Sequence, residues 1–482
     1  VLLILFCFSI LPAGRYLNRI GRILKDLKDF CEQPGKTELL PILLNLVNPV
    51  QTMSELALKR IEENKKTRNP YLHLGWCRLT DVPEELGDCT WLETLVLSNS
   101  LWIDKGEQHG PDTPPEWRRP ENNNQIESIR GIEKLSHLKQ LHISGSGRKW
   151  DLTDLSPLAS LSHLEWLDCN STAVHDLSPL SQLRRLKHLN CSSTDVTDLA
   201  PVSQHPELQY FSCEYTKVAD LSAIAGLDGL ETLYCSNSPV HDLGPLARLG
   251  RLKVLLCPDT KVHDLRPVAG LSELLRLSCS NTQVDDLTPL SGLHQLLLLN
   301  CSHTPVHDLS PLAALTHLQH LYCSYTQVGD LTALQHMRQL QHLHCYYTPV
   351  NSLGPLASLH NLLDLSIYET QVVDLSPLAG LTSLRTLTCF DTPVSDLGPL
   401  AGLTALQELS CCRTQVHDLT PLAGMSGLQY VDFHSTPVRH IFPLTHIPVL
   451  REFHAMLCPI EDCPKEVYDS GDVERLRAFF NI

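Results

Sequence analysis

One pattern of apolar and polar positions recurs along most of the chain with a period of 22 residues. It is clearest in LEWLDCNSTAVHDLSPLSQLRR, from Leu164 to Arg185. Eleven of the fourteen positions that step by 22 from Cys169 are cysteine, and the series is Cys169, Cys191, Cys213, Cys235, Cys257, Cys279, Cys301, Cys323, Cys345, Ile367, Cys389, Cys411, Phe433 and Ala455. Less regular units centre on Leu74, Leu97 and Ile143, so the pattern predicts about 17 stacked coils.

Within each unit the segment L-x-x-L-x-C alternates apolar and polar positions, which is typical of a short strand with one buried face. A strand that returns every 22 residues finds its partner only in the next coil, so we expect one continuous parallel sheet. The Leu and Cys side chains then point inward, where an unpaired cysteine behaves as a small apolar residue.

The polar positions between the strands predict the turns of each coil. A threonine such as Thr172 stands three residues after most cysteines, where its hydroxyl can bond backbone groups at the strand end. Eleven of thirteen coils then carry an aspartate such as Asp176, which we expect to accept a backbone N–H in an Asx-turn. Ser178 and Pro179 suit the N-cap and first position of a helical turn. Calcium binding by the aspartates is the alternative, but the glycine-rich calcium repeat is missing.

These units resemble the 22-residue leucine-rich repeats of internalins, with threonine in place of asparagine and cysteine in place of leucine. The first coil, YLHLGWCRLTDVPEELGDCTWLETLVLS, resembles the repeats of bacterial intracellular proteins. The tail CPIEDCPKEVYDSGDVERLRAFFNI is similar to the segment that leads into the GTPase of Roco-family proteins. The resemblance implies an α/β repeat solenoid: a horseshoe with a parallel concave β-sheet and short helical or 3-10 turns on the convex side.

The same reading divides the chain into four parts. Residues 1–52 form an upstream segment that we expect to be dispensable and not native, because a coherent helix begins only after Met53. We expect an N-terminal capping helix over 53–70, repeats over 71–460, and a C-terminal capping helix or linker over 461–482. An insertion over 98–128 is rich in Pro, Gly and Asn and predicts a long loop.

Charge and cysteine usage restrict the partners and the compartment. The formal net charge is −16, which disfavours nucleic acid and anionic membranes as partners. One cysteine per coil gives no C-x-x-C pair, so we interpret the cysteines as buried thiols rather than metal ligands. Because thiols persist in reducing compartments, we expect a cytoplasmic protein.

Catalytic motifs do not emerge from the sequence. The segment CEQPGKT contains Gly-Lys-Thr, but Phe30 stands where a phosphate loop needs glycine. No serine-hydrolase or zinc-protease motif is present, so we expect no enzyme activity and no cofactor. Histidines that precede the turn aspartates, such as His175, are interpreted as exposed spacers.

Strand positions that alternate with the buried Leu and Cys carry many aromatic side chains. They include Trp166, His188, Tyr210, Tyr215, Tyr234, His303, Tyr430 and His434. The densest group predicts the partner-binding site: His320, Tyr322, Tyr325, His342, His344, Tyr346, Tyr347, Tyr368 and Phe390. Tyr and His combine apolar area with a polar tip, as interface residues require. Two alternatives remain: Tyr tolerates any strand surface, and His320, His342 and His344 could bind zinc.

The function that follows is protein recognition on the concave face, in the sensor part of a Roco-type protein with a downstream GTPase domain. A secreted adhesion protein of internalin type is the alternative, and the cysteine ladder disfavours it.

Overall fold

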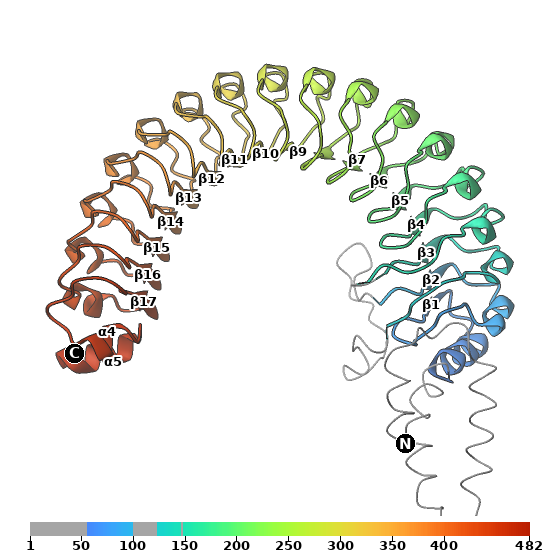
Figure 1. The fold of residues 1–482 in the computed structure, drawn as a ribbon, viewed down its shortest axis with the longest axis horizontal. Helices are drawn as coiled ribbons and strands as arrows, with labels where there is room; N and C mark the ends of the chain where they lie inside the picture. Colours follow the sequence, from blue (N-terminus) through green and yellow to red (C-terminus); the bar gives the residue numbers. More distant parts are fainter. Residues whose placement is uncertain (1–54, 100–122, 146–147) are drawn as a thin grey trace, which may run out of the picture.

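The computed structural model describes residues 55–99, 123–145 and 148–482. They form one open parallel sheet of 17 strands on the inner side of an arc, with 3-10 turns along its outer side (Figure 1). The predicted horseshoe is confirmed. The strands are β1 (Tyr71–His73), β2 (Thr94–Val96), β3 (Gln140–His142), β4 (Trp166–Asp168), β5 (His188–Asn190), β6 (Tyr210–Ser212), β7 (Thr232–Tyr234), β8 (Val254–Leu256), β9 (Arg276–Ser278), β10 (Leu298–Asn300), β11 (His320–Tyr322), β12 (His342–His344), β13 (Asp364–Ser366), β14 (Thr386–Thr388), β15 (Glu408–Ser410), β16 (Tyr430–Asp432) and β17 (Glu452–His454).

Each strand pairs with the next along the chain, and from β4 onward the register repeats every 22 residues. Leu321 thus faces Leu343, which faces Leu365. The strands have three residues rather than six, but the ladder continues beyond them. The Cys345 N–H donates to the Ser366 carbonyl at 3.0 Å, and the Tyr347 N–H donates to the Tyr368 carbonyl at 3.1 Å.

The convex side consists of 3-10 turns: η3 (Glu84–Asp88), η6 (Ile132–Lys134), η7 (Ser156–Leu158), η8 (Ser178–Leu180), η9 (Ala200–Gln204), η10 (Ser222–Ile224), η11 (Gly244–Leu246), η12 (Arg266–Val268), η13 (Thr288–Leu290), η14 (Ser310–Leu312), η15 (Thr332–Leu334), η16 (Gly354–Leu356), η17 (Ser376–Leu378), η18 (Gly398–Leu400), η19 (Thr420–Leu422) and η20 (Phe442–His446). The serine is not the N-cap of these turns. Leu177 holds that position in η8, Ser178 is the first helical residue, and its hydroxyl donates to Asp176 at 2.7 Å.

The threonines and aspartates act as predicted. The Thr172 hydroxyl donates to the Cys169 carbonyl at 2.7 Å, which satisfies an acceptor at the end of the strand. Asp176 accepts the Ser178 N–H at 2.7 Å and so initiates the turn. The aspartate ladder is therefore explained by the turns that it supports.

The eleven ladder cysteines are fully buried, free thiols in the core between the sheet and the turns. Burial raises the pKa of Cys191 to about 12. Some thiols also donate to the carbonyl of the next strand, as Cys257 does to Ser278 at 3.2 Å. The thiolate that reacts with alkylating agents is thus scarce in the folded protein.

We therefore expect native protein to react slowly with a water-soluble thiol reagent at its ladder cysteines, and denatured protein to react fully. Mass spectrometry of the alkylated protein measures this site by site. Disulfides among ladder cysteines would contradict both the burial and the reduced state.

Two caps cover the ends of the described solenoid. At the N-terminal end, residues 55–67 are helical, and Ala57 and Ile61 are fully buried. At the other end lie α4 (Lys465–Tyr468) and α5 (Val473–Phe480), at the end of the arc beyond β17 (Figure 1). Leu476 of α5 is fully buried, so the helix closes the last coil. The predicted upstream segment 1–52 lies outside the described residues.

The ends of the predicted insertion belong to the second coil. Asn124 is fully buried, its amide donates to the carbonyls of Leu74 and Leu97, and its oxygen accepts the Cys77 and Leu79 N–H groups. Ile126 is fully buried two residues later, as the valines are in regular coils. The loop predicted over 98–128 is therefore shorter, because Asn124 resumes the repeat. Residues 100–122 lie outside the described part.

Among the described residues, no helix has the length and apolar character needed to span a membrane.

Candidate protein-binding surface

The nine predicted site residues lie together on the inner side of the sheet, across β11 to β14 and the residues that follow each strand. We refer to His320, Tyr322, Tyr325, His342, His344, Tyr346, Tyr347, Tyr368 and Phe390 as the aromatic surface. Strand alternation places them there, because their neighbours Leu321, Cys323, Leu343 and Cys345 are fully buried. The 22-residue register then brings equivalent positions of adjacent coils side by side.

Two columns of stacked rings run across these coils. In the first, Tyr346 stacks on Tyr368 with ring centroids 4.1 Å apart, and Tyr368 stacks on Phe390 at 4.1 Å. In the second, Tyr325 stacks on Tyr347 at 4.3 Å. Edge-to-face contacts at 5.7 Å join the columns, from Tyr325 to Tyr346 and from Tyr347 to Tyr368. The five rings therefore form one connected surface.

The histidines occupy the other edge of the surface. His320 stacks on His342 with ring centroids 4.6 Å apart, and Tyr322 contacts His344 at 4.9 Å. The carboxylate of Asp364 lies 2.9 Å from Nε2 of His344 and 3.5 Å from Nδ1 of His342. Both imidazoles are therefore oriented by one half-buried acid.

Electrostatics favour neutral phenols and an ionised acid in this place. Burial raises the pKa of Tyr322, and it raises that of Tyr368 more strongly. Burial also acts to raise the pKa of Asp364, but hydrogen bonds and charge from His344 and His342 outweigh it and the net shift is downward. The surface thus offers hydroxyl donors around a carboxylate.

Two rings of the surface stand on strained backbone. Tyr325 and Tyr347 have φ of 54° and 52°, in the left-handed region that disfavours bulky residues. Other coils place Asn237, Asn281 or Asp259 at the equivalent position, and such residues tolerate this conformation better. The tyrosines are also 41% and 42% exposed. Strain at exposed aromatic residues is what a binding site retains and a purely structural turn does not.

Sequence reasoning left three contributors out of the site. His303 stacks on Tyr325 at 4.1 Å and extends the second column, although it was counted among the outward residues. Asp364 holds the two histidines, and the guanidinium of Arg413 lies 5.4 Å from the centroid of Phe390. Stepping by 22 from His342 and Asp391 reaches Asp364 and Arg413, so the period contained the signal.

A second aromatic row lies on β4 to β7, which we call the N-terminal row. Trp166 stacks on His188 with ring centroids 3.3 Å apart, and His188 stacks on Tyr210 at 4.0 Å. Tyr210 meets Tyr234 edge to face at 5.4 Å. Burial, with a smaller contribution from His142, lowers the pKa of His188 to about 3. The histidine is therefore neutral in the folded protein well below its ordinary range.

This histidine predicts a loss of stability in acid. Between about pH 6.5 and pH 3 the unfolded chain binds a proton at His188 that the folded chain does not, so stability falls as pH falls. At pH 4.5 the loss relative to pH 7 is roughly 2–3 kcal/mol. Replacing His188 with Gln should remove that part of the pH dependence, as measured by urea unfolding. The exposed His175→Gln control should keep the parent's slope, and an unchanged slope in His188→Gln would rule out the buried neutral ring.

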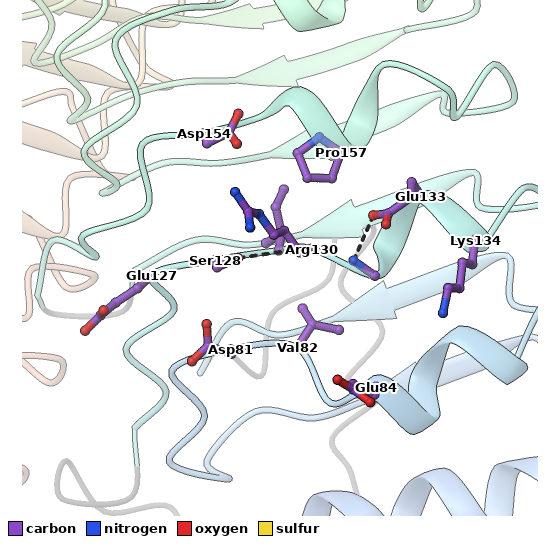
Figure 2. A pocket seen from close by; sticks show the side chains of 12 residues that line it. Asp81, Val82, Glu84, Glu127, Ser128, Arg130, Glu133, Lys134, Asp154 and Pro157 are labelled. Atoms are coloured by element: carbon purple, nitrogen blue, oxygen red, sulfur yellow. Dashed lines mark hydrogen bonds between the residues drawn. The ribbon is translucent and has the colours of Figure 1, made fainter. Parts of the chain in front are cut away.

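A separate hollow of about 750 Å³ lies beside the first coils (Figure 2). Its lining includes Asp81, Glu84, Glu127, Arg130 and Asp154, and Figure 2 shows the Glu133 carboxylate accepting the Gly131 N–H, at 2.7 Å. The acidic groups come from turns rather than from the inner face of the sheet. This hollow is distinct from the aromatic surface.

Comparison with known proteins places the fold. No family model and no curated sequence matches the chain. Among solved structures, an internalin, InlF, from Listeria monocytogenes superposes with a TM-score of 0.60 at 27% identity, over 62% of this chain and 88% of the internalin. A leucine-rich-repeat protein from Leptospira interrogans superposes with a TM-score of 0.67 at 19% identity, over 78% of this chain and 93% of that protein. The chain is a leucine-rich-repeat protein.

The leucine-rich-repeat arc is also similar to that of a plant peptide hormone receptor, RGFR1, solved in complex with RGF2. The TM-score is 0.58 at 15% identity, over 80% of this chain and 66% of the receptor. These neighbours support a protein-interaction module as the general function of the leucine-rich repeats here.

Proposed function

We propose that the chain binds a protein partner on its concave face, through the aromatic surface. The observation that carries the proposal is the continuity of the rings. Nine aromatic side chains from four adjacent coils are stacked on each other, and two of them stand on left-handed backbone. Clustered, exposed aromatic residues are typical of binding sites rather than of free surfaces.

The stacking also indicates what the partner presents. Parallel rings cover each other's faces, so the area left for a partner is the ring edges and the phenol hydroxyls. Ring edges carry partial positive charge, and neutral phenols donate hydrogen bonds. Carbonyl oxygens of an extended polypeptide segment suit such a surface. The peptide hormone in the RGFR1 complex supports this choice of ligand class by analogy.

A photo-crosslinking experiment tests the proposed site. A photoreactive amino acid in place of Tyr347, which is 42% exposed, should capture a partner from an extract of the source cells. The same residue in place of His307, exposed outside the sheet, is the control. Crosslinks that form from position 307 and not from position 347 would contradict the proposal.

A second proposal concerns the context of the repeats. The similarity of the C-terminal tail to the segment ahead of a Roco GTPase supports a role as the sensor part of such a protein in the cytoplasm. The buried thiols support the reducing compartment. A phosphate-loop motif encoded in frame within the next hundred or so residues beyond Ile482 is the expected finding. A signal peptide with ladder thiols that oxidise in the native protein would instead favour a secreted, internalin-like adhesion protein.

A further inference from the structure

The inner face carries one group of side chains outside the aromatic surface whose chemistry is that of metal ligands. Cys412, Asp432 and His434 each offer a ligand atom, and these atoms all lie within 4.8 Å of one another. Among the described residues, this is the group of three or more such side chains that converges in this way. Cys412 is also set apart from the ladder, because it follows Cys411 and belongs to the sheet's inner surface.

The repeat explains why the three residues meet. Asp432 and His434 flank the buried Phe433, so strand alternation puts both on the inner face. The preceding coil places Cys412 beside them, because the Arg413 N–H donates to the His434 carbonyl at 2.9 Å and keeps the two coils in register. Cys412 and His434 therefore stand at equivalent positions of adjacent coils.

The present contacts show an oriented imidazole. Nδ1 of His434 lies 2.7 Å from the Asp432 carboxylate, and Nε2 lies 3.2 Å from Nη1 of Arg413. A guanidinium only donates, so Nε2 accepts and Nδ1 carries the proton. Asp432 is 13% exposed, His434 is 29% exposed and Cys412 is 4% exposed. The three groups are thus held in a partly dry place on an otherwise open face.

We propose that Cys412, Asp432 and His434 form a zinc site with one open coordination position toward the concave side. A thiolate, an imidazole and a carboxylate together suit Zn²⁺ and disfavour Mg²⁺ or Ca²⁺, which prefer oxygen ligands. Bonds of about 2.0–2.3 Å place tetrahedral ligand atoms roughly 3.2–3.7 Å apart, so a side-chain adjustment of about 1 Å completes the site. Binding releases the Cys412 proton, and the thiolate and carboxylate balance the charge of the ion.

Arg413 opposes the metal in the present arrangement. Its guanidinium contacts His434 and forms an ion pair with Asp391, in which Nε lies 2.8 Å from Oδ1. A metal that takes a nitrogen of His434 requires Arg413 to leave that ring, while Asp391 keeps the guanidinium nearby. Removing the guanidinium should therefore strengthen metal binding, which a merely structural cluster does not predict.

The zinc set considered from the sequence is a different one, and its geometry is unfavourable. His320 and His342 stack face to face, and His342 and His344 both contact Asp364. Those rings are engaged with each other and with one acid, and they do not converge on a common point. They supply a matched control on the same sheet face.

Titration of the full chain with Zn²⁺ under reducing conditions tests the proposal, with Co²⁺ as a spectroscopic probe. The parent should bind one ion and show a thiolate-to-cobalt charge-transfer band. Cys412→Ser should abolish the band and weaken Zn²⁺ binding by more than about 100-fold, beyond what loss of an outer-shell partner costs. Arg413→Asn should tighten binding, and His344→Ala should leave it unchanged.

Each contrary outcome is decisive if circular dichroism shows that the variants are folded. A parent that binds no Zn²⁺, or a Cys412→Ser variant that binds it as tightly as the parent, would overturn the site. Loss of binding in His344→Ala, with binding retained in Cys412→Ser, would assign the ion to the histidine cluster instead.

Discussion

Replacing Leu343 with alanine should lower the free energy of unfolding by about 2–5 kcal/mol. Leu343 lies in the central strand β12, is fully buried, and is in register with Leu321 and Leu365. Each coil packs only on its two neighbours, so a cavity here weakens two interfaces at once. Urea unfolding followed by circular dichroism measures the effect.

The matched control for this substitution is Tyr346→Ala, three residues along the same coil. Tyr346 lies on the inner face and contributes ring contacts rather than core, so its loss should change stability by less than about 1 kcal/mol. Equal losses in the two variants would mean that the inner face supports the fold as much as the core does. The aromatic surface would then need no functional explanation.

Replacing Tyr346, Tyr368 and Phe390 together with alanine should abolish tight binding to the partner that crosslinks at position 347. These residues form one stacked column. A central aromatic residue that acts as a hot spot contributes about 2 kcal/mol or more, which is roughly thirtyfold in affinity for a single substitution. The triple variant should lose more than that, chiefly through faster dissociation. Surface plasmon resonance measures both rates.

The N-terminal row provides the control for that experiment. Tyr210 and Tyr234 are in edge-to-face contact on β6 and β7, so their replacement removes two tyrosines from the same face of the sheet. That variant should bind the partner within about threefold of the parent. If it loses binding while the triple variant keeps it, the partner occupies the N-terminal row.

Much of this molecule could be predicted because its sequence repeats. The inward Leu and Cys, the donor role of Thr172 and the acceptor role of Asp176 all follow from position in one coil. Repetition then gives the register that stacks Tyr346 on Tyr368. Local rules and tertiary contacts coincide in such a fold, because each contact joins equivalent positions of neighbouring coils.

The errors fall where the coil departs from simple propensity. Ser178 has the composition of an N-cap, but the Asx-turn of Asp176 fixes the backbone first and leaves Leu177 in that place. Asn124 was interpreted as part of a polar loop, although its amide satisfies backbone groups of two coils. The Cys412 group was missed because its members belong to two coils and were considered one column at a time.

Hydroxyl-radical footprinting of the chain with and without its partner tests the central claim most directly, because it reports the exposure of individual aromatic side chains. If the aromatic surface is the binding site, Tyr325 and Tyr347, now 41% and 42% exposed, lose reactivity in the complex. Tyr215 at 61% and Phe442 at 42% are exposed elsewhere and keep theirs. Unchanged reactivity at Tyr325 and Tyr347 with protection at Phe442 would contradict the account and place the partner outside the concave face.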